Sequence, residues 1–136
     1  MLSRKSLHLA LFAIALAATP GTAVAVCVMP KTLDGIWKAN DGGTYQVRLV
    51  GNVIWWVGMS ADNGRHWTHV FRGIRSGNLI NGQWADVGER VRGAGTLSLR
   101  VRDNASMDRT ASAGSGYAGM RWRRPCPDTV GIPVDE

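Results

Sequence analysis

Charged residues make up only 19% of this chain of 136 residues, and no long apolar run occurs after residue 25. The missing apolar run excludes a membrane-spanning helix in that part of the chain. The low charge, together with a hydrophobic content of 45%, excludes a disordered chain. A helical period is also missing after residue 26, whereas 17 glycines and 6 tryptophans are present. These features favour a single all-β domain over a helix bundle.

Sequence motifs of common catalytic sites are absent. The chain has no Gly-x-Ser-x-Gly, no His-Glu-x-x-His and no phosphate-binding glycine loop. Asp86 and Glu89 form an acidic pair that suits glycoside cleavage, but loops often contain such pairs. His66 and His69 do not suggest a metal site, because residues three apart in a strand point to opposite faces. We therefore expect a protein that is not an enzyme and that holds no metal and no cofactor.

The first 25 residues have the layout of a secretory signal peptide. Arg4 and Lys5 give a positive start, Leu7–Ala18 is apolar apart from one histidine, and a small-x-small cleavage pattern follows at 23–25. The apolar stretch is too short to span a bilayer. We expect residues 1–25 to be removed and the mature domain, 26–136, to be periplasmic or secreted.

Two cysteines, Cys27 and Cys126, lie close to the two ends of this mature domain. In an oxidising compartment we expect them to form a disulfide, with two free thiols as the alternative. A loop of that length restricts the unfolded chain by about 4–5 kcal/mol in the chain-entropy treatment. The pairing requires the two ends of the domain to meet in space.

Turn signals rich in glycine, asparagine and aspartate recur about every 8–12 residues, which is the spacing of short antiparallel strands. Gly51-Asn52, for example, is a two-residue hairpin signal. Inward apolar residues alternate with outward polar ones in several segments. The strands predicted on this basis are Ile36–Ala39, Thr44–Val50, Val53–Met59, Thr68–Arg75, Leu79–Asp86, Gly95–Arg102, Ser106–Ala111 and Ala118–Arg124.

Eight locally connected antiparallel strands can close into an up-and-down β-barrel. Closure places the first strand beside the last, and this would also bring Cys27 and Cys126 together. The strand count and the cysteine positions are independent observations, and both favour the barrel. The alternative is a two-sheet β-sandwich.

The tripeptide Gly35-Ile36-Trp37 opens the first predicted strand. Here the chain resembles the calycins, the lipocalin and avidin group of eight-stranded barrels, whose first strand carries Gly-x-Trp. In lipocalins a basic residue near the last strand packs over this tryptophan, and Arg121, Arg123 or Arg124 would take that place. The resemblance implies a barrel architecture and a packing role for Trp37 at the barrel floor.

Residues 60–67 fit the pattern Ser-x-Asp-x-Gly-x-x-Trp. This segment resembles the Asp-box, a hairpin loop that is repeated in sialidase propellers. In such a loop the aspartate accepts hydrogen bonds from turn amides, the glycine takes a positive φ and the tryptophan packs beneath. We expect Ser60, Asp62, Gly64 and Trp67 to shape a hairpin between the third and fourth strands rather than to bind a ligand.

The tryptophans lead to the functional hypothesis. Trp55 and Trp56 are adjacent in a strand, so that one points inward and the other faces solvent, an interface or a ligand. Alternation places Trp122 on the same face as Met120. Exposed aromatic residues beside arginine suit sugar stacking or a protein interface.

We predict a non-catalytic binding protein for a small molecule or glycan, with a tryptophan-lined barrel mouth as its site. Arg72 or Arg75 would contact an anionic group. The candidate ligand-binding residues are Trp55, Trp56, Trp84, Trp122, Arg72 and Arg75. For the basic face of an exported protein, an acidic glycan or an envelope lipid is a better partner than nucleic acid.

The alternative function is inhibition of a secreted hydrolase, of the kind shown by small periplasmic protease and lysozyme inhibitors. The barrel would then be solid, and its loops would contact the enzyme. Those loops are Asn40–Gly43, Asp62–His66 and Asp86–Arg92. The two hypotheses therefore differ in whether the barrel contains a cavity, and the sequence leaves the oligomeric state open.

Overall fold

The computed structural model describes residues 24–126 and 129–132, so the predicted signal peptide lies outside the described residues except for its last two positions. Within these ranges the secondary structure consists of strands. None of the described residues belongs to a helix that is long and apolar enough to cross a bilayer. The strands are β1 (Val24–Cys27), β2 (Gly35–Ala39), β3 (Thr44–Val50), β4 (Val53–Met59), β5 (Thr68–Ser76), β6 (Leu79–Asp86), β7 (Ala94–Asp103), β8 (Ser106–Gly114), β9 (Arg121–Arg123) and β10 (Thr129–Ile132).

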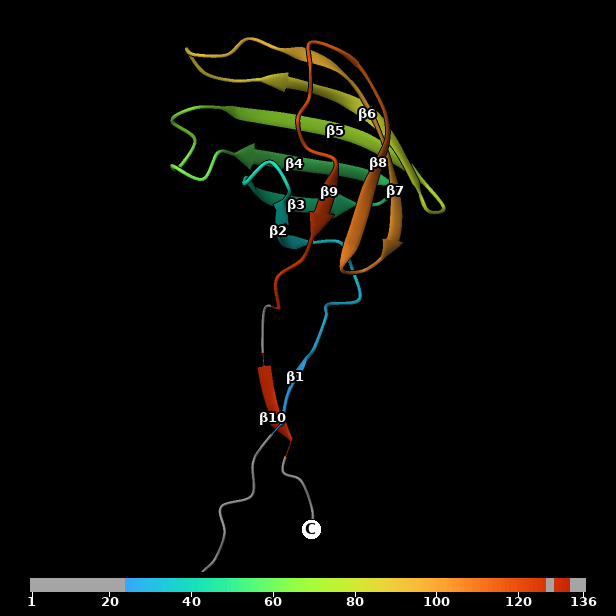
Figure 1. Cartoon of the computed structure of the whole chain (residues 1–136). Helices are drawn as coiled ribbons and strands as arrows, with labels where there is room; N and C mark the ends of the chain where they lie inside the picture. Colours follow the sequence, from blue (N-terminus) through green and yellow to red (C-terminus); the bar gives the residue numbers. More distant parts are fainter. Residues whose placement is uncertain (1–23, 127–128, 133–136) are drawn as a thin grey trace, which may run out of the picture.

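Strands β2 to β9 form a closed antiparallel barrel, in which each strand pairs with its neighbours in sequence and β9 returns to pair with β2 (Figure 1). The closing pair is short, because only Lys38 and Ala39 face Arg123 and Trp122 in register. The eight-stranded barrel is therefore confirmed over the β-sandwich. The closure follows from hairpin connections that are all local, so the first and last strands are the two free edges left to join.

The predicted strands β3, β4 and β6 agree with the structure at both ends, but the predicted last strand, Ala118–Arg124, is wrong at its start. The backbone amides of Met120 and Arg121 both donate hydrogen bonds to Oδ1 of Asn40, at 2.8 and 2.9 Å. The chain therefore turns around the Asn40 side chain before β9 begins. As a result Met120 is exposed while Trp122 is fully buried, so the expected shared face of these two residues is also wrong.

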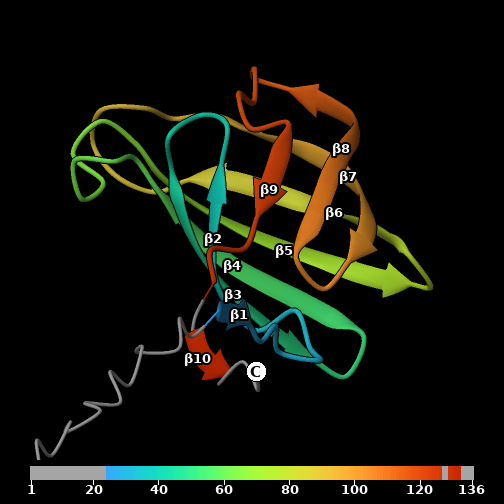
Figure 2. The ribbon, with the colours of Figure 1, turned by 60° about the horizontal axis from the view of Figure 1, so that its bottom comes forward.

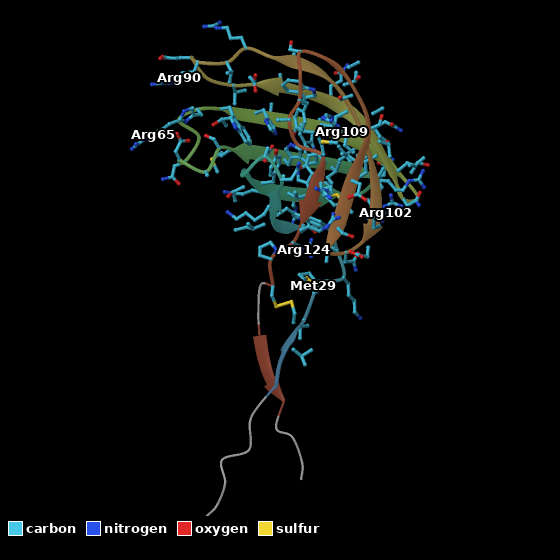
Figure 3. All side chains as sticks on the ribbon, in the orientation of Figure 1. Met29, Arg65, Arg90, Arg102, Arg109 and Arg124 are labelled. Atoms are coloured by element: carbon cyan, nitrogen blue, oxygen red, sulfur yellow. A yellow bond between two sulfur atoms is a disulfide. The ribbon has the colours of Figure 1, made fainter. Side chains whose placement is uncertain are left out.

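The two ends of the described chain meet outside the barrel. Strand β1 pairs with β10 in an antiparallel ladder, with Cys27 opposite Thr129. Cys27 and Cys126 form a disulfide with their Cα atoms 5.5 Å apart, and Figure 3 shows this bond between the barrel and the terminal ladder. The predicted pairing of the cysteines is therefore confirmed, whereas the sequence pattern did not predict the terminal ladder.

The barrel interior is filled by large side chains that point inward at alternate strand positions. The rings of Trp56 and Phe71 stack with their centroids 4.2 Å apart, and Tyr45 packs edge-on against Trp56 at 5.5 Å. The largest fully buried side chains are those of Trp37, Trp122, Tyr45, Phe71, Leu33, Ile54, Ile80, Leu97, Leu99 and Met107. Aromatic residues of this size leave little free volume in the middle of a narrow barrel.

One end of the barrel, the base, is closed by Trp37 and Arg124. The guanidinium carbon of Arg124 lies 4.7 Å from the centroid of the Trp37 ring, and both residues are buried. The Trp37 indole donates a hydrogen bond to the Leu33 carbonyl at 2.9 Å, and Nη2 of Arg124 donates one to the Thr32 carbonyl at 2.8 Å. Among the three candidate arginines, it is therefore Arg124 that packs over the tryptophan, as the calycin resemblance implied.

Candidate functional site

The end of the barrel opposite the base, here called the mouth, is formed by four loops. They connect β2 to β3 (40–43), β4 to β5 (60–67), β6 to β7 (87–93) and β8 to β9 (115–120). Figures 1 and 2 show the β4–β5 and β6–β7 loops projecting on the same side, away from the β5–β6 turn. The Val87 amide of the β6–β7 loop donates a hydrogen bond of 2.8 Å to the carbonyl of Thr68, the residue that follows the β4–β5 loop.

A pocket of about 160 Å³ opens between these loops. It is lined by Asp41, Trp67, His69, Trp84, Asp86, Val91, Gly116, Tyr117 and Ala118. The volume suits one ring, since an engineered protein cavity of about 150 Å³ holds benzene. The packed aromatic core lies beneath, so the pocket is confined to the mouth.

His69 forms the buried floor of this pocket. Alternation along β5 points it inward with Phe71, and its Nε2 lies 2.7 Å from the Tyr117 hydroxyl. Its ring also stacks on Trp67, with centroids 4.9 Å apart and an angle of 3° between the planes. Gly58 of β4 stands opposite in register, and a Cβ atom there would lie 2.5 Å from His69 Nε2. The His69 ring therefore fits here because residue 58 is a glycine and has no Cβ atom.

Burial lowers the pKa of His69 to about 4, although the charges of Asp86 and Asp41 oppose this shift. The imidazole is consequently neutral at pH 7, with one ring nitrogen that donates and one that accepts. A neutral histidine can hydrogen-bond a ligand without adding positive charge to the pocket.

Two tyrosine hydroxyls and the carboxylate of Asp41 add further polar groups at this end of the barrel. The Tyr45 hydroxyl donates a 2.5 Å hydrogen bond to Oδ2 of Asp41, whose Oδ1 accepts one from the Gly43 amide at 2.8 Å. Burial raises the pKa of Tyr45 and of Tyr117 well above the usual range, and the charge of Asp41 adds to both shifts. Both hydroxyls are therefore protonated at neutral pH.

Asp86, at the end of β6, is the second carboxylate of the pocket. Its Oδ2 accepts a hydrogen bond from the Gly93 amide at 2.7 Å, which fixes the β6–β7 loop against the strand. The lining of the pocket contains two carboxylates and no lysine or arginine. Among the described residues, the ion pairs involve neither Asp41 nor Asp86.

The four candidate tryptophans do not gather in one site. Trp56 and Trp122 are buried in the core, and the Trp84 ring, which is 4% exposed, borders the mouth pocket. Trp55 is 48% exposed on the outer face of the barrel. One of the two adjacent tryptophans therefore faces outward, as predicted, and it is Trp55.

The two candidate arginines lie away from the pocket. The Arg72 guanidinium carbon lies 5.4 Å from the centroid of the Trp55 ring, on the outer face of neighbouring strands. Nε of Arg75 donates a hydrogen bond to the Gly77 carbonyl at 2.9 Å, in the β5–β6 turn. Neither guanidinium lines the mouth, so neither is placed to bind an anionic group there.

The β4–β5 loop has the hydrogen bonds that its sequence pattern predicts. Oδ1 of Asp62 accepts hydrogen bonds from the amides of Arg65 and His66 at 3.1 and 3.3 Å, and Gly64 has a φ of +81°. Trp67 packs against the core, and it also lines the pocket.

His66 and His69 are held in different surroundings. Nδ1 of the exposed His66 lies 2.5 Å from Oδ2 of Asp62, whereas His69 is inside the barrel. Within the described part of the chain, no three histidine, cysteine, aspartate or glutamate side chains are grouped closely enough to hold a metal ion.

Sequence reasoning did not single out Asp41, Tyr45 or Tyr117 as site residues. The alternation of β3 does predict that Tyr45 points inward, and a search for inward polar residues would also have found His69 on β5. Tyr117 lies between Gly116 and Ala118 in a loop without strand periodicity, so no local signal places it in the pocket.

Comparisons of this chain with models of protein families, with curated proteins and with solved structures find no match. The closed barrel and its mouth pocket are therefore the features from which a function can be inferred.

Proposed function

We propose that this protein is an exported, non-catalytic binding protein that takes a small molecule, or the terminal ring of a glycan, into the mouth pocket. The observation that carries the proposal is the pocket of about 160 Å³, which has aromatic walls and the buried His69 at its floor. Apolar walls with a few convergent polar groups are typical of small-molecule sites. The volume favours a ligand group the size of a single ring.

The chemistry of the lining supports binding rather than catalysis. The lining residues include no serine, threonine, cysteine or lysine, and both carboxylates of the lining already accept hydrogen bonds from loop amides. The Tyr117 hydroxyl and His69 are hydrogen-bonded to each other, so they present a fixed polar surface to a ligand. The tryptophans that line the mouth are Trp67 and Trp84. Trp56 and Trp122, which the sequence predicts to be there, lie in the core.

Three features support an exported, calycin-like protein. The signal-peptide layout of residues 1–25 directs export, and the disulfide of Cys27 with Cys126 suits an oxidising compartment such as the periplasm or the extracellular space. The stacking of Arg124 on Trp37 in an eight-stranded barrel supports kinship with the calycins.

A pocket-filling variant tests the proposal. Gly116 lines the pocket, and a Cβ atom there meets nothing within 4 Å, so Gly116→Leu should fill the space without disturbing the core. We expect ring-sized probes, both neutral and charged, to bind the oxidised protein in calorimetric titrations and to lose affinity in Gly116→Leu. Ala111→Leu, on the exposed part of β8, is the matched control and should bind normally. Failure of every probe to bind, or equal binding to both variants, would contradict the proposal.

A second candidate function is inhibition of a secreted hydrolase, because the barrel is solid beneath the pocket and the β4–β5 and β6–β7 loops lie side by side. Figure 3 shows Arg65 and Arg90 projecting from these two loops. The corresponding assay measures inhibition of a panel of secreted proteases and lysozymes. Under this function, Arg65→Ala and Arg90→Ala should weaken inhibition, while Gly116→Leu should leave it intact.

A further inference from the structure

The mouth pocket differs in charge from the rest of the molecule. The chain has 16 basic and 10 acidic residues, a formal net charge of +6. The pocket nevertheless contains two carboxylates, Asp41 and Asp86, and no basic side chain other than His69. The lining of the pocket is therefore negatively charged although the protein as a whole is basic, and carboxylates in such a lining attract positive ligands.

Both carboxylates have capacity to accept further hydrogen bonds. A carboxylate offers about four lone-pair sites. Asp41 accepts from one amide and one hydroxyl, and Asp86 accepts from the Gly93 amide. All of these donors are neutral, so the charges of Asp41 and Asp86 are not balanced by an ion pair among the described residues. Half-buried carboxylates without a counter-charge are stabilised when a cation binds beside them.

The walls of the pocket also suit a cation. Trp67, Trp84 and Tyr117 line it together, and aromatic rings attract an ammonium or guanidinium group through their negative faces. The buried imidazole of His69 is held by the Tyr117 hydroxyl at the floor, and in its neutral form it does not repel a positive ligand. Cages of aromatic side chains are a known arrangement for binding ammonium groups.

We infer that the ligand of the mouth pocket carries a cationic nitrogen, with Asp41 and Asp86 holding this group at the rim and the aromatic walls enclosing the rest. This inference rests on the proposed function, because it assumes that the pocket binds a small molecule. The sequence predicts an anionic ligand group bound by Arg72 or Arg75, but both arginines lie outside the pocket. The inferred ligand charge is therefore the opposite one. The pocket volume restricts the enclosed part to about one ring.

Two probes of the same size and different charge test the inference. Benzylammonium and benzyl alcohol each carry one ring and differ in the charged group. We expect calorimetric titration of the oxidised protein to give at least a tenfold tighter dissociation constant for the amine, with a preference that decreases as salt is added.

Matched aspartate variants locate the interaction. Asp41→Asn and Asp86→Asn keep an oxygen that accepts the Gly43 and Gly93 amides, so the loops should retain their structure. Each variant should weaken binding of the amine by about fivefold or more and leave the alcohol unchanged, since only the amine loses an attractive charge. Asp103→Asn, at the last residue of β7 beside the turn to β8 at the base, is the control and should change neither.

The outcomes separate the inference from the proposed function. Equal affinity for the amine and the alcohol would overturn the cationic ligand and leave a ring-binding pocket in place. Failure of both probes to bind would overturn both. If one aspartate variant fails to fold, as judged by circular dichroism, the other variant and the comparison of the two probes still decide the question.

Discussion

Nε2 of His69 lies 2.7 Å from the hydroxyl of Tyr117, a residue 48 positions further along the chain. The contact joins β5 to the β8–β9 loop inside the barrel mouth, where both side chains are buried. Because burial lowers the pKa of His69 to about 4, the protein holds a neutral imidazole under conditions in which an exposed histidine begins to take up a proton. This has a direct consequence for stability.

We predict that the protein loses stability as the pH falls from about 6.5 to about 4. Across this window the unfolded chain binds a proton at His69, whose unperturbed pKa is 6.5, while the folded protein does not. The free energy of unfolding should therefore decrease by about 3 kcal/mol in total as the pH falls through the window. Urea denaturation at a series of pH values measures this slope.

His69→Gln is the control for this prediction, because it removes the titrating group. The carboxylates whose pKa is lowered, Asp34, Asp62, Asp103 and Asp108, are protonated at lower pH and are present in both proteins. In the variant, the free energy of unfolding should decrease less between pH 6.5 and 4 than in the original protein. An unchanged slope would show that His69 is not the group responsible.

Gly58→Ala should destabilise the barrel by about 1–3 kcal/mol, because the added methyl group overfills a packed interior. The new Cβ would lie 2.5 Å from His69 Nε2 and 2.6 Å from Cε1 of Tyr45, so one of the two rings must move. Gly116→Ala is the matched control, since nothing lies within 4 Å of its Cβ position. Equal unfolding free energies for the two variants would argue against a tight fit around His69.

Arg124→Ala should lower the free energy of unfolding by about 2–4 kcal/mol, because a buried cation–π contact and a large packed side chain are lost together. Arg124→Lys should recover little of this stability, since an ammonium group lacks the flat surface that packs over the Trp37 ring. Arg121→Ala, on the exposed face of β9, is the control and should change stability by less than about 0.5 kcal/mol. A double-mutant cycle with Trp37→Phe would isolate the pairwise contribution, and no coupling would contradict the role of this pair at the base.

Much of the fold could be predicted because its connections are local. Each hairpin has its own turn signal, and the alternation within Thr44–Val50 or Leu79–Asp86 sets the inward face without reference to the rest of the chain. The start of β9 could not be predicted in this way. It depends on the Asn40 side chain, which reaches backbone amides 80 residues away.

The site was less predictable than the fold, for a similar reason. Alternation shows that Trp55 and Trp56 face opposite sides, but the register with β3 and β5 decides which one joins the core. Trp56 and Trp122 are packed in the core and do not line the mouth. A narrow barrel has no room for both their indole rings and a deep cavity. The pocket is completed by loop residues such as Tyr117, whose position is set by tertiary contacts and not by local sequence.

The disulfide lies at the base, on the side of the terminal ladder (Figure 3), while the pocket opens at the mouth. It joins the segments that lead into β2 and out of β9, and these two strands close the barrel through a ladder of only two residue pairs. The covalent bond therefore supports the shortest ladder of the barrel.

Reduction of the disulfide, or replacement of Cys27 and Cys126 by serine, should lower the free energy of unfolding by about 4–5 kcal/mol, because a loop with a sequence separation of 99 is released in the unfolded chain. Urea denaturation with and without reductant measures the change, and the double serine variant should not respond to reductant. Below the unfolding transition, the reduced protein should still bind ring-sized probes with unchanged affinity, because the mouth loops are held by their own hydrogen bonds. A loss of probe binding while the barrel remains folded would show instead that closure at the β2–β9 seam shapes the pocket at the other end.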